Sequence, residues 1–240
     1  MKDTPQRKQN PMVQELLELN ERHSKEFVSS QRSRQIYRVK HPTEIAVMKC
    51  MDGRVHVPVM TKTPFGIFQP WRNIGGQFDL GWPHFKETIK EWARYSVSRA
   101  RQSVVLTTYH FARGFEGEDA EVVKKRGCAG HNYDTPKAIA DSFELKKQFD
   151  RVYKNDRLYA IQCGIETDLD ALILHGENGE VVDLAKQTFD GTSEVVEMLV
   201  RIYPHIPLEV IYDLVPLVEG NIQHIAEVRE SNRPLADSEH

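Results

Sequence analysis

Three apolar runs, separated by long stretches of chain, constrain the fold of this sequence most strongly. They lie at 44–50, 103–110 and 158–166 and are rich in the β-branched residues that favour strands. A continuous apolar run is typical of a strand covered on both faces, and such strands run parallel when helical segments connect them. The pattern therefore predicts an α/β fold with a mainly parallel central sheet flanked by helices.

The segments around these runs complete the predicted order of elements. Apolar residues repeat at helical spacing in 12–29, 85–100, 136–154, 193–203 and 207–229. Around Asn178-Gly179, a strong turn signal, the sequence predicts a hairpin of two short strands within 171–184. We also expect a short strand at 66–69, a loop over the rest of 66–83, and a short helix at 119–126.

We divide the chain into three parts. Residues 1–11 are polar and predict a flexible N-terminus, whereas 12–184 hold all the predicted strands and form one domain. Residues 185–240 predict a helical C-terminal extension. Because this extension carries Leu, Ile and Val at helical spacing, we expect it to pack either on the body of the protein or on another subunit.

Composition and charge exclude several classes of protein. The sequence is 40% apolar and 28% charged, and its formal net charge is −3. It has no excess of basic residues, so its charge gives no reason to expect nucleic-acid binding. The sequence contains no run of about 18 apolar residues, so we expect no membrane span. The charged N-terminal stretch does not resemble a secretory signal. The three cysteines favour a reducing compartment, so we expect a cytoplasmic protein.

Two of the cysteines and one histidine fall where a parallel sheet places its functional residues. Cys50 ends the first apolar run, His110 ends the second, and Cys128 follows after a polar, glycine-punctuated insertion. Two thiolates and one imidazole suit a zinc ion, and three protein ligands leave a fourth position open, as catalytic sites do. The alternative is that the cysteines are small core residues and the histidine is merely hydrogen-bonded.

The residues after Cys50 add a second pattern. In an extended segment Cys50, Asp52 and Arg54 would point to the same side. Asp52 and Arg54 could then form a charge-assisted pair that keeps the carboxylate ionised and oriented beside a metal. A surface ion pair is the alternative interpretation of Asp-x-Arg taken alone.

With these residues, the sequence resembles the β-class carbonic anhydrases. That family has C-x-D-x-R at the end of its first strand, and here the pattern runs from Cys50 to Arg54. The stretch 71–76, WRNIGG, resembles the family's R-N-[AI]-G-N loop, and VVLTTYH at 104–110 resembles its strand that ends in the histidine ligand. LLELNERHSKEF at 16–27 and the hairpin at 171–184 resemble its leading helix and its terminal hairpin. The resemblance thus spans roughly 12–184, in the same order.

The sequence departs from the family at one ligand. The family normally has H-x-x-C-G-G, but here Arg113 stands three residues after His110, and Cys128 comes only after the insertion. The divergent carboxysome-shell branch of the superfamily also separates these ligands, so this chain is closest to it in pattern. His131 and Cys163 are the alternatives for the third ligand. His131 could instead hydrogen-bond to a ligand or carry a proton.

The resemblance implies a zinc enzyme that reversibly hydrates carbon dioxide to bicarbonate by means of a metal-bound hydroxide. It assigns Cys50, His110 and Cys128 to the metal, and Asp52 and Arg54 to catalysis. Gly75 and Gly76 would allow a close approach of substrate, and His56 or His131 could carry the proton.

The alternatives are a hydrolase of carbon disulfide or carbonyl sulfide on the same scaffold, and a non-catalytic shell or scaffold relative. The resemblance also implies a homodimer or a larger homo-oligomer. A location within a protein microcompartment is the alternative to free cytoplasm.

Overall fold

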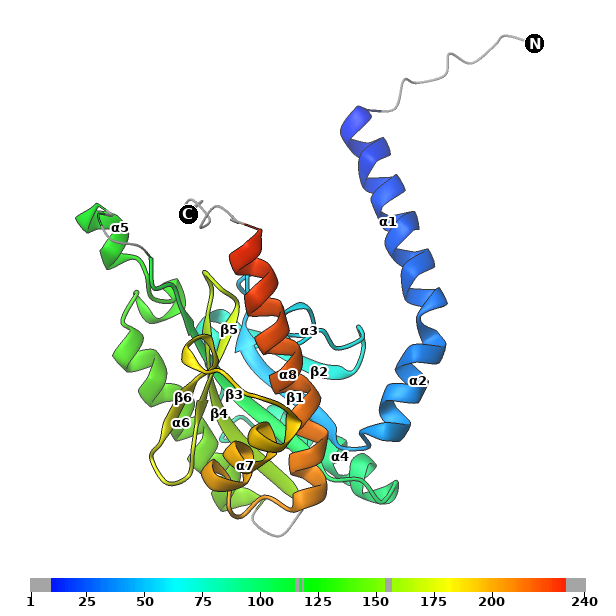
Figure 1. Ribbon diagram of the computed structural model, residues 1–240, viewed down its shortest axis with the longest axis vertical. Helices are drawn as coiled ribbons and strands as arrows, with labels where there is room; N and C mark the ends of the chain where they lie inside the picture. The colour runs from blue at the N-terminus through cyan, green and yellow to red at the C-terminus, as the bar shows by residue number, and fades with distance from the viewer. Residues whose placement is uncertain (1–9, 115–116, 118, 154–156, 232–240) are drawn as a thin grey trace.

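The computed structural model describes residues 10–114, 117, 119–153 and 157–231, and Figure 1 shows its arrangement. Most of the predicted flexible N-terminus, 1–11, lies outside the described residues. Six strands form a single sheet: β1 (Glu44–Cys50), β2 (Phe68–Asn73), β3 (Ser103–Phe111), β4 (Leu158–Glu166), β5 (Ala171–His175) and β6 (Val181–Asp183).

The sheet has the order β2-β1-β3-β4-β5-β6. The first four strands in that order are parallel, and β5 and β6 add an antiparallel hairpin at one edge. The prediction of a mainly parallel α/β sheet is therefore confirmed. Because β1 and β3 are neighbours in parallel, their carboxyl ends, with Cys50 and His110, lie at the same edge of the sheet.

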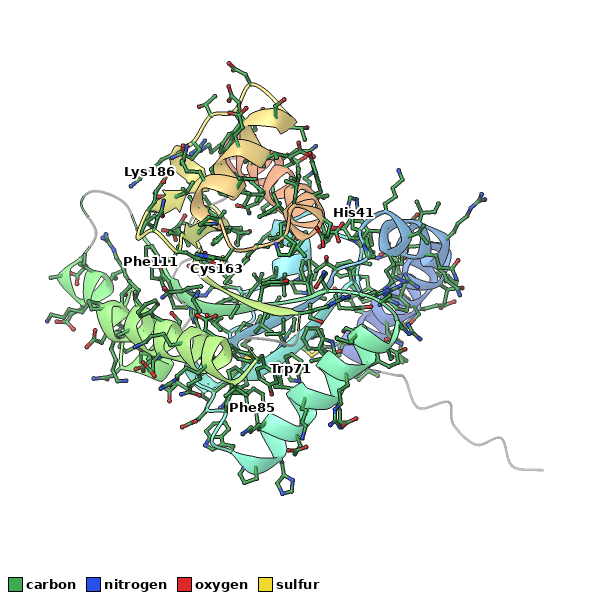
Figure 2. All side chains as sticks on the ribbon, turned by 90° about the horizontal axis from the view of Figure 1, so that it is seen from below. His41, Trp71, Phe85, Phe111, Cys163 and Lys186 are labelled. Carbon is green, nitrogen blue, oxygen red and sulfur yellow. The ribbon has the colours of Figure 1, made fainter. Side chains whose placement is uncertain are left out.

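Helices cover both faces of this sheet. The long ones are α4 (Pro83–Ser98), α6 (Thr135–Val152), α7 (Thr192–Ile202) and α8 (Leu208–Glu230). Side chains that alternate along β1 divide the core: Ile45 and Val47 join the apolar cluster under α7 and α8, whereas Ala46 and Met48 join the cluster under α4 and α6. Figure 2 shows the two layers on opposite sides of the sheet, with Trp71 and Phe85 on the α4 side.

The predicted C-terminal helices belong to the core of the protein. Residues of α7 and α8 share one buried cluster with the strands, and Asn221 of α8 is completely buried. The Asn221 side chain accepts a hydrogen bond from the backbone N–H of Leu172 and donates to the carbonyls of Met60 and Asp170. Of the two sequence alternatives, packing on the body is the one that the described residues display.

Strand β2 differs from the prediction of a short strand at 66–69 followed by a loop. It runs from Phe68 to Asn73 and pairs with β1 along its whole length, from Ile45↔Phe68 to Cys50↔Asn73. Pro70 favoured a loop, because proline cannot donate a ladder hydrogen bond, but β2 is an edge strand, where proline is tolerated.

The chain after Cys50 is not extended, so the predicted alternation does not place Asp52 and Arg54. It makes a tight turn, in which the backbone N–H of Arg54 donates to Asp52 Oδ1 at 2.9 Å, and then forms the short helix α3 (Val57–Met60). An aspartate that accepts from a backbone N–H two residues on is a common turn motif. In the insertion, α5 (Ala120–Lys124) forms the short helix expected at 119–126.

The N-terminal helices project from the body (Figure 1). In α1 (Pro11–Ser29) and α2 (Gln31–Lys40), all of them described, no side chain is buried. The apolar stripe of α1 is open to solvent, and its members Met12, Leu16, Leu17 and Phe27 are each about half exposed or more. None of the helices in the described part of the chain is both long and apolar enough to cross a membrane.

Candidate metal centre

Cys50, His110 and Cys128 meet at the carboxyl ends of β1 and β3. Their ligand atoms, two sulfurs and one imidazole nitrogen, all lie within 4.8 Å of one another. The two sulfurs are 3.7 Å apart. Among the described residues these three are the one group of His, Cys, Asp and Glu side chains found in an arrangement that could hold a metal ion.

The environment of these atoms fits a metal. All three side chains are buried, at 7%, 3% and 2% exposure for Cys50, His110 and Cys128. Nε2 of His110 is buried, and among the described residues it has no hydrogen-bond partner. Buried polar atoms are normally satisfied, so an orphaned nitrogen beside two thiols fits the role of a metal donor. Two cysteines and one histidine match the donor set of zinc, with a fourth position left for water or substrate.

The sulfur pair is electrostatically prepared for a cation. The hydrogen bond between the two thiols, aided by the nearby His110 ring, lowers the pKa of Cys50 to about 3, although burial acts against this shift. The same hydrogen bond and burial raise the pKa of Cys128. Cysteine ligates a metal as the thiolate, so the lowered pKa of Cys50 favours the binding of a cation at this pair.

Asp52 lies next to the three donors and is held by Arg54. The guanidinium of Arg54 donates to both carboxylate oxygens of Asp52, from Nε at 3.2 Å and from Nη2 at 2.8 Å. Asp52 Oδ2 is 3.9 Å from His110 Nε2. Burial would raise the pKa of Asp52, but the hydrogen bonds from Arg54 lower it to about 2. The carboxylate is therefore ionised and oriented beside the metal ligands, and both side chains are partly buried.

Two glycines let the loop after β2 approach the centre. Gly75 and Gly76 are buried and have positive φ angles, 66° and 67°, which glycine adopts without strain. A Cβ on Gly76 would lie 3.2 Å from the backbone N of Cys50, and one on Gly75 would lie 2.9 Å from the His131 ring. Other protein atoms lie close beside both glycines, and the close approach of substrate expected there stays a prediction.

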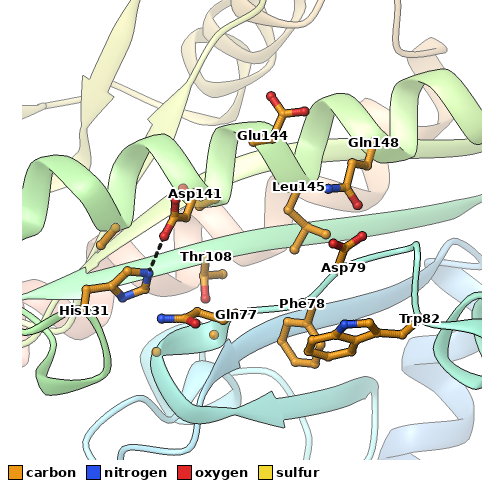
Figure 3. A pocket seen from close by; sticks show the side chains of 14 residues that line it. Gln77, Phe78, Asp79, Trp82, Thr108, His131, Asp141, Glu144, Leu145 and Gln148 are labelled. Carbon is orange, nitrogen blue, oxygen red and sulfur yellow. Dashed lines mark ion pairs between the residues drawn. The ribbon is translucent and has the colours of Figure 1, made fainter.

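His131 and Cys163 lie outside the group of three donors. Cys163 is 1% exposed in the middle of β4, and its thiol donates to the Gly164 carbonyl at 3.4 Å. His131 lines a neighbouring cavity of about 290 Å³, shown in Figure 3, where its Nε2 is 3.3 Å from Asp141 Oδ2. The third position of the donor group is thus filled by Cys128, and His131 lies just behind Gly75.

Sequence reasoning missed the residues that bring Cys128 to this place. The cysteine is flanked by Gly127 and Gly130, and a Cβ on either would lie within 2.4 Å of another backbone atom, Tyr133 O or Gly75 N. The Gly-Cys-Ala-Gly spacing was the available signal, because glycine is required where two backbones approach closely. Arg113 and Asp168, which support the insertion, carried no comparable signal.

Comparison with known proteins gives structural neighbours only. No protein-family model matches the chain, and no curated protein does. Similar solved structures include the β-carbonic anhydrase CcaA, at 15% identity over 75% of this chain and 94% of that one, with a TM-score of 0.49. Others are a carbonic anhydrase from Streptococcus mutans (17%, 65% and 96%, TM-score 0.33) and the β-carbonic anhydrase CafA of Aspergillus fumigatus (12%, 81% and 99%, TM-score 0.40).

At these identities the chain's own residues define the site. It consists of two cysteines, one histidine and an Asp–Arg pair at the carboxyl ends of β1 and β3. This is a candidate metal centre with a carboxylate held beside it.

Proposed function

We propose that this protein is a zinc-dependent carbonic anhydrase that interconverts carbon dioxide and bicarbonate. The observation that carries the proposal is the convergence of Cys50, His110 and Cys128, with Asp52 held beside them by Arg54. The sequence patterns of the β class place the cysteine, aspartate and arginine of 50–54 and the histidine at 110 at the same strand ends, and the second cysteine comes here only after the insertion. Zinc, when bound, supplies the chemistry by lowering the pKa of a coordinated water from about 15.7 to about 7.

The protein's own residues have distinct tasks in this reaction. Cys50, His110 and Cys128 would hold the metal, since each offers one donor atom to the shared centre. Asp52, kept ionised by Arg54, can accept a hydrogen bond from a water beside His110. Arg54 acts through Asp52, because it donates through two guanidinium nitrogens to that carboxylate and so prevents it from rotating into the metal position.

Metal analysis of purified protein tests the ligand set. We expect about one zinc per chain in the wild type and in Cys163→Ser, and a marked loss in Cys50→Ser and Cys128→Ser. Cys163→Ser is the matched control, because it removes a buried thiol outside the donor group. Full zinc occupancy in Cys128→Ser would contradict the assignment of that ligand.

Carbon dioxide hydration, followed by the release of protons, tests the reaction. We expect turnover in the zinc-loaded wild type and a reduction of about 10²-fold in Asp52→Asn with zinc retained, as for a positioned proton acceptor. Zinc binding without hydration, but with hydrolysis of carbon disulfide or carbonyl sulfide, would instead support the alternative substrates. Zinc binding with neither activity would support a non-catalytic relative.

We further propose that two copies associate through α1, in the cytoplasm. The support is the solvent-exposed apolar stripe of α1, which includes Leu16 and Leu17 at 58% and 55% exposure. Sedimentation of the wild type at micromolar concentration should give a dimer or larger assembly, and the double variant Leu16→Glu/Leu17→Glu should shift it toward monomer. Glu18→Gln on the same helix is the control, and a monomeric wild type would contradict the proposal.

A further inference from the structure

Backbone contacts between Phe111–Ala112 and Arg126–Gly127 close the base of the insertion between His110 and Cys128. The chain leaves β3 at Phe111 and returns at Gly127, where the two residues form an isolated antiparallel bridge. The backbone N–H of Ala112 donates to the Arg126 carbonyl at 2.7 Å. These contacts close the base of the insertion, and Cys128 is the next residue after the bridge. The position of the base therefore decides where the Cys128 sulfur lies.

The outgoing side of this base is fastened to the turn after β4. Asp168 Oδ2 accepts hydrogen bonds from two successive backbone N–H groups, Arg113 and Gly114, each at 2.7 Å. The Phe111 carbonyl accepts from the backbone N–H of Thr167 at 2.9 Å. A carboxylate that accepts from two backbone amides fixes the direction of that backbone, since such charge-assisted bonds are stronger than neutral ones.

The guanidinium of Arg113 forms ion pairs with two other carboxylates. Its Nη2 donates to Asp183 Oδ2 at 2.5 Å, and its Nε is 3.9 Å from Glu166 Oε2. Glu166 is completely buried and accepts from the backbone N–H groups of Asp168 and Leu169. Lys186 also contacts Asp183, at 3.4 Å, but its side chain is largely exposed. The partly buried Arg113 side chain thus contacts Asp183 and Glu166, whereas its backbone N–H donates to Asp168.

The incoming side of the base has little freedom once the outgoing side is fixed. A Cβ on Gly127 would lie 2.2 Å from the Tyr133 carbonyl oxygen, and one on Gly130 would lie 2.4 Å from the backbone N of Gly75. The backbone N–H groups of His131 and Tyr133 both donate to the Cys128 carbonyl, at 2.9 and 3.0 Å. The return segment 127–131 is therefore a compact unit that is held at two places: by the bridge to Phe111 and Ala112, and by the loop after β2, where the Gln77 side chain donates to the Gly130 carbonyl at 2.8 Å.

We propose that Arg113 and Asp168 are positioning residues for the candidate metal centre, because they anchor the insertion so that Cys128 reaches Cys50 and His110. This inference rests on the proposed function. In this chain Arg113 stands where the family pattern places its second cysteine, so the anchor and the displaced ligand belong to one arrangement. The anchor acts through the backbone of the insertion and touches no metal ligand itself.

Cysteine alkylation in the metal-free protein tests the anchor without relying on activity. Cys128 and Cys163 are both buried in the wild type, at 2% and 1% exposure. In Arg113→Ala we expect iodoacetamide to modify Cys128 about tenfold faster or more, as read by peptide mass spectrometry, while Cys163 keeps its wild-type rate. Faster modification of both thiols would mean general loss of the fold, and the milder variant Arg113→Lys then decides. Unchanged protection of Cys128 in both variants overturns the proposal.

Cobalt(II) binding gives the second readout, because thiolate ligands produce an intense charge-transfer absorption. We expect Arg113→Ala to lose intensity and affinity toward the values of Cys128→Ser, with Arg113→Lys in between. Arg201→Ala, which removes an exposed arginine that binds Glu180 through two nitrogens, should match the wild type. A wild-type spectrum in Arg113→Ala contradicts the anchor, whereas absence of thiolate absorption in the wild type contradicts the metal centre instead.

Discussion

The free energy of unfolding of Arg54→Ala should show whether Asp52 and Arg54 form a partly buried pair that holds the carboxylate or an ordinary surface ion pair. The change removes two hydrogen bonds from guanidinium to Asp52 and leaves the one from the backbone N–H of residue 54. In the wild type the Asp52 pKa is lowered from 3.8 to about 2, which corresponds to about 2.4 kcal/mol at about 1.36 kcal/mol per pH unit.

Solvent reduces that contribution. The side chains of Arg54 and Asp52 are 30% and 21% exposed, so we expect Arg54→Ala to lose about 1–2 kcal/mol of unfolding free energy at pH 7. A carboxyl group with a lowered pKa in the native state stabilises it at pH values above about 3.8. This contribution is lost as the pH falls toward 2, so the difference between wild type and variant should shrink over the same interval.

Urea unfolding of chelator-treated protein, monitored by circular dichroism at a series of pH values, measures this difference. Arg201→Ala is the matched control, because it breaks a pair with Glu180 whose side chains are 59% and 36% exposed, and it should cost well under about 1 kcal/mol. If Arg54→Ala costs no more than this control at pH 7, the pair is an ordinary surface contact. A difference that persists undiminished at pH 2 would show that its cause is not the ionised Asp52.

Three further substitutions test the surroundings of the site by chemical denaturation. The Lys49 ammonium is buried without a hydrogen-bond partner among the described residues, and burial lowers its pKa from 10.5 to about 8. Lys49→Met should therefore raise the free energy of unfolding by about 1–3 kcal/mol at pH 7, and this gain should decline as the pH rises from 8 to 10.5. A destabilised variant would contradict this. Burial raises the Glu166 pKa from 4.5 to about 7, so the free energy of unfolding of the wild type should fall, relative to Glu166→Gln, as the pH rises from 4.5 to 7. Parallel pH profiles of the two proteins would refute this prediction. Gly130→Ala places a Cβ 2.4 Å from Gly75 N and should cost about 1–3 kcal/mol, whereas Gly53→Ala, with nothing within 4 Å, should cost less; equal losses would count against this.

Local sequence patterns located most of the elements that build the site. The runs that end in Cys50 and His110 form β1 and β3, since β-branched apolar residues suit strands covered on both faces. The helices that were predicted and the hairpin around Gly179 lie within a few residues of their predicted bounds, because amphipathic spacing and turn chemistry are local properties. The helices α2 and α3 were not predicted. Parallel pairing of β1 with β3 then brings Cys50 and His110 to one edge of the sheet.

Patterns that depend on neighbouring strands were less informative. Pro70 argued for a loop in the sequence, and only the position of β2 at the sheet edge makes a strand compatible with it. The Asp52–Arg54 pair was expected from strand alternation, but it forms in a turn. There the Asp52 side chain accepts a hydrogen bond from the backbone N–H of Arg54. The pair was predicted from the right residues for a different geometric reason.

Short-range spacing predicted the sheet, the strand-end positions of Cys50 and His110, and the residue types of the candidate metal centre. The identity of the third donor depends on the tertiary structure. Cys128, His131 and Cys163 were all open alternatives, and a long insertion can return to many places. Its return is set by contacts distant in sequence: Asp168 on the amides of Arg113 and Gly114, and the bridge of Phe111 to Gly127. Such contacts exist only once β4 and its turn are in place beside β3, and no local pattern encodes them.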